Sequence, residues 1–230
     1  MKLNERQQQI LELVDQKQRV SVAFLAKRLY VSEMTVRRDL IKLEQESLLR
    51  RYHGGALAIH DYLEYPIQLR AHINEKEKRD LAKQAEQFLR DGQTIFLPSS
   101  STCSFLIPLL KQFKGIRVIT NSVQFAISLA RMQISCILTG GEYRENSRSL
   151  VGRVAEATLR SMNTDIAILT CDGISDDGMV TVEEESGAEL VRIGFQNTQK
   201  RVILIDRSKM GMRYTYNVCH RDEVDHILIL

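Results

Sequence analysis

Cysteine and proline are scarce in this sequence, and the few histidines follow no metal-binding pattern. Its 230 residues include four cysteines, and no two of them form a Cys-x-x-Cys pair, so neither a disulfide scaffold nor a zinc finger is expected. The five histidines contain no His-Glu-x-x-His pair, and we therefore expect no catalytic metal. With three prolines and 43% hydrophobic residues, the chain has the composition of a folded globular protein.

Long hydrophobic segments are also missing. No apolar run approaches the roughly 18–20 residues that a membrane-spanning helix needs. The sequence begins directly with a polar helical pattern, which is not typical of a signal peptide. We therefore expect a cytoplasmic protein with no membrane partner.

The charges are distributed unevenly along the chain. Residues 1–58 hold 11 Lys or Arg and 7 Asp or Glu, a net charge of +4, whereas the rest of the chain holds 21 and 22, a net charge of −1. A small basic segment joined to a nearly neutral one suggests two functions, one of them contact with a polyanion. We accordingly expect one domain over residues 1–58, a linker over 59–73 and a second domain over 74–230.

Apolar residues recur at helical spacing in the basic segment, and they predict three short helices. These helices are expected to span residues 4–17, 22–29 and 33–46. Asn4 is a plausible N-cap for the first, and Ser32 is one for the third. The inner stripe of the third helix is expected to consist of Val36, Leu40 and Leu43.

The opposite side of the third helix carries basic residues. Because a helix fits the major groove of B-DNA and its first turns approach the base edges, this side is a candidate for DNA contact. Gly54 and Gly55 then separate two short strand-like runs, which predicts a hairpin that would act as the wing of a winged helix-turn-helix. The residues expected to contact DNA are Ser32, Met34, Thr35, Arg37, Arg38, Lys42, Arg50, Arg51, His53 and Gly54.

An isolated pair such as Arg37 and Arg38 is usually a solvated helix face. Here the pair starts the third of three short helices and is followed by a basic Gly-Gly hairpin, and this combination favours DNA binding. Residues 4–57 closely resemble the N-terminal domain of DeoR-type bacterial transcriptional regulators. The resemblance rests on the Ser-x-x-Thr-Val-Arg-Arg-Asp-Leu pattern of residues 32–40 and the Arg-x-His-Gly-Gly pattern of residues 51–55.

Short apolar segments alternate with helical patterns through the rest of the chain. This alternation predicts an α/β domain with a mostly parallel sheet and helices on both faces. The predicted strands span residues 94–97, 117–120, 135–139, 165–170, 201–205 and 226–230. The predicted helices span residues 74–90, 102–112, 123–132, 153–162 and 184–196, and Asn74 is expected to cap the first of them.

Small, polar or charged loops follow the predicted strands. Ligands bind outside the carboxyl ends of the strands in open parallel sheets, so these loops are a candidate site. Four consecutive hydroxyl residues before a predicted helix would form a cradle for an anion such as a phosphate, although such hydroxyls more often only cap the helix. Arg148 is an additional candidate for counter-charge. The residues expected to bind the effector are Ser99, Ser100, Ser101, Thr102, Asn121, Gly140, Gly141, Arg144, Asp172 and Lys209.

The family resemblance extends over this second domain. It rests on the hydroxyl loop and on residues 120–122, 138–144, 171–174 and 206–211. The resemblance implies an effector domain whose fold is similar to sugar-phosphate isomerases and CoA transferases, and it implies a phosphorylated sugar as the effector. The family commonly has Asp and, two residues later, Gly in the first loop, where this chain has Pro98 and Ser100.

Two functions of different classes fit these patterns. The first is a transcriptional regulator, expected to be a repressor of a carbohydrate-utilisation operon, which binds double-stranded operator DNA as a homodimer or homotetramer and responds to a phosphorylated sugar. The second is a sugar-phosphate isomerase fused to a DNA-binding head, with Asp172 or Glu185 as the base and Lys209 stabilising an enediolate. We favour the regulator because no isomerase motif is intact, and we expect neither catalytic residues nor a cofactor.

Overall fold

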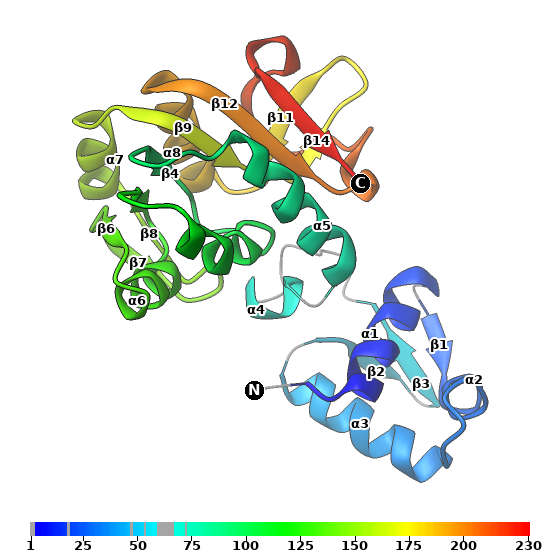
Figure 1. Ribbon diagram of the computed structural model, residues 1–230. Coiled ribbons are helices and arrows are strands. Elements are labelled where there is room, and N and C mark those ends of the chain that lie inside the picture. Colours follow the sequence, from blue (N-terminus) through cyan, green and yellow to red (C-terminus); the bar gives the residue numbers. More distant parts are fainter. Residues whose placement is uncertain (1–2, 18, 47, 53, 59–66, 72) are drawn as a thin grey trace. The chain divides into compact units, whose positions relative to one another are not determined.

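The computed structural model describes residues 3–17, 19–46, 48–52, 54–58, 67–71 and 73–230. The chain divides into two compact units, Met1–Ile73 and Asn74–Leu230 (Figure 1). The predicted linker over residues 59–73 falls largely outside the described residues, and within it the short helix α4 spans Ile67–Arg70. No helix in the described ranges is long and apolar enough to cross a membrane.

Three helices and a small antiparallel sheet make up most of the first unit. The helices are α1 (Glu5–Lys17), α2 (Val22–Arg28) and α3 (Glu33–Gln45). The strands β1 (Arg19–Ser21), β2 (Arg50–Tyr52) and β3 (Gly55–Leu57) pair in the order β1-β3-β2. The predicted helices and hairpin are thus confirmed, with helix ends that differ by one residue, and the arrangement is a winged helix-turn-helix.

Polar caps explain where these helices begin. The side-chain oxygens of Asn4, Ser21 and Ser32 each accept a hydrogen bond from the backbone amide three residues on, at 2.9, 3.1 and 3.2 Å. Such a cap satisfies one of the unpaired amides of the first helical turn and contributes about 1 kcal/mol.

A six-stranded sheet organises the second unit. Its strands are β4 (Thr94–Phe96), β5 (Arg117–Thr120), β6 (Ser135–Leu138), β9 (Thr164–Leu169), β12 (Thr198–Ile205) and β14 (His226–Ile229). They pair in the order β14-β12-β9-β4-β5-β6, and every neighbouring pair is parallel. The predicted parallel α/β domain is therefore confirmed.

The strand order reverses between β4 and β9. From β4 the chain adds β5 and β6 on one side, and it then returns to pair β9 with the other side of β4. The connections leaving β4 and β9 therefore diverge at the carboxyl ends of these two strands. A divergence of this kind opens the crevice in which doubly wound folds bind ligands.

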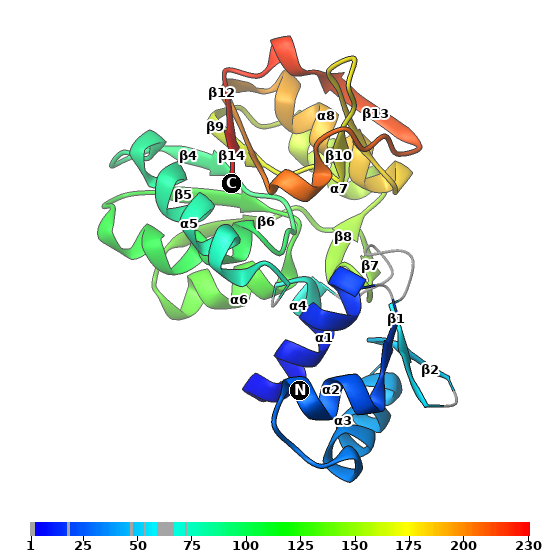
Figure 2. The same cartoon turned by 90° about the vertical axis from the view of Figure 1, so that its right-hand side faces the viewer.

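Both faces of the sheet are buried, as alternate residues of β9 illustrate. Ile166 and Ile168 belong to one core cluster, whereas Ala167 and Leu169 belong to the other. Figure 2 shows α5 (Glu75–Ala85) and α6 (Val123–Arg131) on one side of the sheet, and α7 (Arg153–Arg160) and α8 (Glu185–Gln196) on the other. Burial on both faces explains why the strands are continuous apolar runs in the sequence.

Two smaller antiparallel sheets were not predicted. Strands β7 (Glu142–Arg144) and β8 (Ser149–Val151) form a hairpin between β6 and α7. Strands β10 (Gly173–Ile174), β11 (Met179–Val182) and β13 (Tyr216–His220) form a three-stranded sheet in that order. The strands of both sheets are two to five residues long, so their periodicity is too brief to be distinguished from loops.

Two local predictions in the second unit were wrong. The segment predicted as a helix over residues 102–112 forms two 3-10 helices, η3 (Cys103–Phe105) and η4 (Ile107–Gln112). Pro108 stands in the first turn of η4, and its ring and missing amide are incompatible with a continuous α-helix through this point. Asn74 makes no side-chain cap bond because its backbone is left-handed, with φ of +52°.

Gly194 of α8 lies directly against the sheet. A Cβ at this position would stand 2.3 Å from the ring of Phe96, which is fully buried. We expect Gly194→Ala to lower the free energy of unfolding by about 1–3 kcal/mol through overpacking. Gly187→Ala in the same helix is the matched control, because a Cβ there meets nothing within 4 Å, and it should be neutral or stabilising by up to about 1 kcal/mol. Equal melting temperatures for both variants in calorimetry would contradict this packing.

Candidate nucleic-acid interface and ligand site

The buried stripe of α3 fixes which of its residues face solvent. Val36, Leu40 and Leu43 are at most 1% exposed and belong to the core of the first unit, as predicted. The opposite side is exposed, and the side chain of Met34 near its N-terminus is 63% exposed. The other exposed predicted contacts on α3 and its cap are Ser32, Arg37, Arg38 and Lys42, whereas Thr35 is half-buried.

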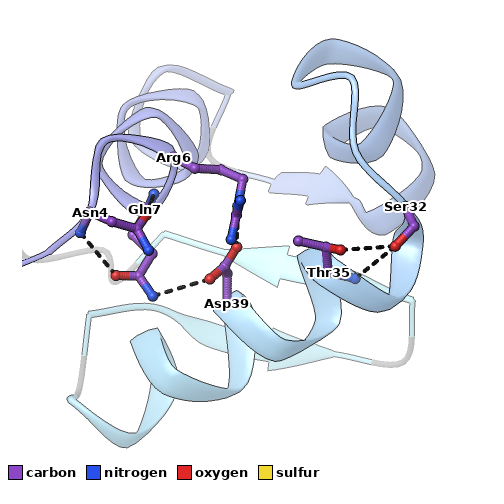
Figure 3. A network of polar contacts seen from close by, with 6 residues as sticks. All are labelled: Asn4, Arg6, Gln7, Ser32, Thr35 and Asp39. Carbon is purple, nitrogen blue, oxygen red and sulfur yellow. Dashed lines mark hydrogen bonds and ion pairs between the residues drawn. The ribbon is translucent and has the colours of Figure 1, made fainter.

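A buried carboxylate also holds α3 in place (Figure 3). Asp39 is 4% exposed and accepts hydrogen bonds from the Nε of Arg6 at 2.6 Å and from the Nε2 of Gln7 at 3.1 Å. Gln7 is itself buried, and its side chain also accepts a bond from the backbone amide of Asn4 at 3.2 Å. The hydrogen bond to Asp39 raises the pKa of the Arg6 guanidinium, and it ties the first turn of α1 to the middle of α3.

Asp39 was not predicted to have a structural role. Its signal was its position, three residues after Val36 and four before Leu43, which places it on the inner face of the helix. A charged residue at such a position is buried only when it is paired and hydrogen-bonded, and Arg6 and Gln7 fulfil both conditions.

The basic residues predicted to contact DNA differ in how far they are already engaged. Arg37 pairs with Glu33 at 3.2 Å. The Nε of Arg51 pairs with Glu44 at 2.7 Å, and the Arg51 amide donates to the same carboxylate, which lowers the pKa of Glu44. Within the described part of the chain, no ion pair involves the other three cations, Arg38, Lys42 and Arg50.

The wing depends on two adjacent glycines with different roles. Gly54 has φ of +98°, a left-handed conformation that favours glycine at the hairpin turn. A Cβ on Gly55 would stand 2.1 Å from the carbonyl oxygen of Val20, so glycine is needed there for the close approach of β1. His53, also predicted to contact DNA, lies outside the described residues.

In the second unit, the loops after β4 and β9 meet at the point where the strand order reverses. The Oγ1 of Thr170 donates to the Oγ of Ser100 at 2.9 Å, and the thiol of Cys103 donates to the carbonyl of Ile168 at 3.5 Å. The loop after β12 joins them, because the Nζ of Lys209 donates to the carbonyl of Cys171 at 2.9 Å. Hydroxyls and one cation from three loops thus gather at this edge.

Much of the hydroxyl loop is engaged within the protein. The Oγ of Ser100 accepts hydrogen bonds from the amides of Thr102 at 3.2 Å and Cys103 at 3.3 Å. The predicted cradle of free amides at the start of an α-helix is therefore wrong, since these two amides are capped and a 3-10 helix follows. Among the described residues, none forms a hydrogen bond with the hydroxyl of Ser101 or of Thr102.

The thiols at this edge are not nucleophiles. Burial raises the pKa of both Cys103 and Cys171 to about 12, and the nearby charge of Lys209 only partly offsets this rise. Both cysteines therefore remain protonated thiols at neutral pH. Lys209 is close enough to both thiols for its charge to lower their pKa values.

Asn121, predicted to bind the effector, already makes two hydrogen bonds within the protein. Its Oδ1 accepts from the amide of Ser99 at 2.8 Å, and its Nδ2 donates to the carbonyl of Leu150 at 3.1 Å. It thereby joins the first loop to β8, and it is only 5% exposed. The Oγ of Ser99 reinforces this link by donating to the carbonyl of Ser147 at 2.7 Å.

The remaining predicted residues border the same edge. Asp172 is half-buried, and its Oδ2 accepts from the amide of Glu183 at 3.0 Å. Gly140 and Gly141 follow β6 with left-handed φ values, and a Cβ on Gly141 would stand 2.4 Å from the carbonyl of Val151. Arg144 is exposed on β7, 3.8 Å from Glu142, and makes no other ion pair among the described residues.

Two family models together match nearly the whole chain. One, described as the DeoR C terminal sensor domain, matches residues 73–229. The other, described as the DeoR-like helix-turn-helix domain, matches residues 6–61. A solved structure with a similar fold is eIF2B delta from Chaetomium thermophilum, with a TM-score of 0.51 and 15% identity over 67% of this chain and 56% of that chain.

Curated relatives align over almost their full lengths. The lactose phosphotransferase system repressor of Lactococcus lactis subsp. lactis is 33% identical over 91% of this chain and 84% of its own. The L-fucose operon activator of Haemophilus influenzae is 32% identical over 90% and 84%. The glycerol-3-phosphate regulon repressor of Escherichia coli is 28% identical over 99% and 90%.

The Asp39 network predicts an asymmetry between two acidic residues of α3. We expect Asp39→Ala to lower the free energy of unfolding of the first unit by about 1–3 kcal/mol, because the buried Gln7 amide loses its partner. Glu44→Ala is the matched control on the same helix. It removes an exposed ion pair with Arg51 of β2 and should lower the free energy of unfolding by less than about 1 kcal/mol. Calorimetry of the full chain would contradict this role if both variants melted alike.

Proposed function

Because this chain belongs to the DeoR family of transcriptional regulators, we propose that it is a repressor of a carbohydrate-utilisation operon and that a phosphorylated sugar modulates its affinity for operator DNA. The family assignment places its first unit among helix-turn-helix DNA-binding domains and its second among sensor domains. Repression is supported by relatives named as repressors, although the fucose relative is named as an activator.

One observation carries the DNA-binding part of the proposal. The exposed face of α3 and the wing carry Arg38, Lys42 and Arg50, none of which pairs with an acid among the described residues. Unpaired cations on a helix of groove-fitting size attract phosphates and can read bases. Arg37 and Arg51 are held by Glu33 and Glu44, and each retains guanidinium N–H groups beyond that pair.

We infer that the sensor site lies at the loops that follow β4, β9 and β12. Lys209 supplies the cation for a phosphate, and the hydroxyls of Ser101 and Thr102 are donors without a partner among the described residues. Asp172 retains acceptor capacity for sugar hydroxyls. The glycerol-3-phosphate regulon repressor among the relatives supports a phosphorylated effector.

We infer no enzymatic activity. The two carboxylates considered as bases differ in placement, since Asp172 already accepts the Glu183 amide and Glu185 is exposed at the start of α8. No hydrogen bond or ion pair joins Glu185 to Lys209 among the described residues. Burial raises the pKa of Cys103 and Cys171, the thiols at the site, to about 12, which disfavours a thiolate nucleophile at neutral pH.

An operator with two-fold symmetry requires two symmetrically placed DNA-binding domains. We therefore propose a homodimer or homotetramer as the active species. An effector bound to the second unit then changes DNA affinity by a coupling free energy, typically about 1–3 kcal/mol.

Removing one unpaired cation tests the proposed interface. We expect Arg38→Ala to weaken binding to a duplex enriched from a random pool by the wild-type protein. If Arg38 contacts a phosphate, the slope of log affinity against log salt should fall by about 1. Arg131→Ala is the matched control, because Arg131 is exposed on α6 in the second unit and forms no ion pair with any residue that the structure describes. Unchanged binding by Arg38→Ala in fluorescence anisotropy would contradict the assigned face.

A thermal-shift panel of sugar phosphates and the matching free sugars tests the sensor site. A phosphate at 100 times its Kd should stabilise the protein by about 2.7 kcal/mol, and its free sugar should not. Lys209→Met should abolish this shift while DNA binding without ligand persists. Lys200→Met is the control, since Lys200 lies towards the amino end of β12 and Lys209 follows its carboxyl end. A full shift with Lys209→Met would locate the phosphate elsewhere.

A further inference from the structure

The turn between α2 and α3 contains a tyrosine in a position that glycine usually occupies. Helix α2 ends at Arg28, and Leu29 is its C-cap. The amide of Val31 donates to the carbonyl of Ala26 at 3.1 Å, which closes the six-residue hydrogen-bonded loop typical of a glycine-terminated helix. Tyr30 is the left-handed residue of this loop, with φ of +55°.

This conformation is unfavourable for tyrosine and brings it no packing in return. A Cβ in the left-handed region crowds the backbone, which is why glycine is preferred there. The side chain of Tyr30 is 92% exposed, and its hydroxyl forms no hydrogen bond with any described residue. The Tyr30 side chain therefore adds little packing and no hydroxyl hydrogen bond to the described part of the first unit. A strained residue that the fold does not need is a reason to look for a binding role.

The surroundings of Tyr30 are basic. Lys27 and Arg28 at the end of α2 are exposed, and neither forms an ion pair with a described residue. Ser32, two residues further on, is the cap from which α3 begins. Tyr30 therefore stands between two unpaired cations and the amino end of the helix that carries Arg38.

We propose that Tyr30 contacts DNA, and that its hydroxyl donates a hydrogen bond to a backbone phosphate at the rim of the groove that α3 enters. This inference rests on the proposed DNA-binding function. In a helix-turn-helix the first turns of the second helix reach the bases, whereas the residues leading into it run beside the phosphates. Met34, exposed in the first turn of α3, is the apolar side chain placed to reach bases, so a phosphate remains for the tyrosine.

Two substitutions separate the contact from the fold. Tyr30→Gly removes the side chain and supplies the residue that the turn prefers, and Tyr30→Phe removes only the hydroxyl. Tyr143→Phe is the matched control, because Tyr143 is half exposed on β7 of the second unit. The full chain is tested on a 30-base-pair duplex of random sequence at low salt and on a duplex enriched from a random pool by the wild-type protein. Arg38→Ala serves as the reference for the proposed function.

We expect Tyr30→Gly and Tyr30→Phe to lose affinity to the same extent, by about tenfold, on both duplexes. The loss should not depend on sequence, because phosphates carry no sequence information. The salt slope should remain that of the wild type, since a neutral hydroxyl releases no counterion. Tyr30→Gly should melt at or above the wild-type temperature, and Tyr143→Phe should bind DNA like the wild type.

Each contrary outcome has a separate meaning. Wild-type binding by Tyr30→Phe with a loss for Tyr30→Gly would overturn the phosphate contact in favour of contact through the ring. Wild-type DNA binding by both Tyr30 variants would overturn the inference altogether, and so would a lower melting temperature for Tyr30→Gly. If the oligomeric state of the variants changed while DNA binding did not, Tyr30 would be assigned to a contact between protein subunits. If the wild-type protein binds neither duplex, or Arg38→Ala has no effect, the proposed function or its assigned face fails first.

Discussion

The rotation of α3 about its own axis is the constraint on which the proposed DNA interface depends. Val36, Leu40 and Leu43 hold one face in the core, and Asp39 ties the same face to α1. Successive residues of a helix are about 100° apart, so a rotation by one residue would bury Arg37 or Arg38 and expose apolar surface. The cations face solvent because the opposite face is held at four positions. An apolar stripe alone tolerates some rotation, whereas a buried ion pair with two donors requires one particular orientation.

A comparable constraint operates in the second unit, where the order of the strands brings together the residues of the proposed ligand site. Because β9 returns to the side of β4 that β5 leaves free, β4 and β9 are neighbours and the loops that follow them begin side by side. Thr170 and Ser100 are 70 residues apart in sequence, yet their hydroxyls lie 2.9 Å apart at this point. Pairing within the sheet, and not local sequence, brings the hydroxyl loop and Lys209 together.

The parts predicted well from sequence were those with a repeated pattern. The inner stripe of α3 repeats apolar residues over several helical turns, and the six parallel strands repeat a short apolar segment along the chain. The hairpin was predicted from the Gly-Gly turn between two short strand-like runs. The segment over residues 102–112 was misassigned because its apolar residues recur at helical spacing, while Pro108 prevents the continuous hydrogen-bonding ladder. Asp39 was missed because its partners Arg6 and Gln7 lie more than 30 residues away, and nothing in a local window reveals them.

The loops of the proposed ligand site show a second limit of prediction from sequence. Some of their polar groups already form hydrogen bonds within the protein. Composition alone could not reveal that Ser100 caps its own loop or that both ends of the Asn121 amide are occupied. Ser100 also clarifies the departure from the glycine usual in the family, because its backbone φ is not left-handed and its hydroxyl holds two amides that would otherwise lack a partner.

Hydrogen bonds between the loops at the carboxyl edge of the sheet are the contacts that a bound effector would have to change. Lys209 donates to the Cys171 carbonyl, and the hydroxyls of Ser100 and Thr170 join the β4 and β9 loops. A ligand shifts a conformational equilibrium only by its difference in affinity for the two states. A phosphate that drew Lys209 from the carbonyl of Cys171 would exchange a bond between the β9 and β12 loops for one to the ligand. A phosphate at the proposed site would therefore change how the β9 and β12 loops are tied together.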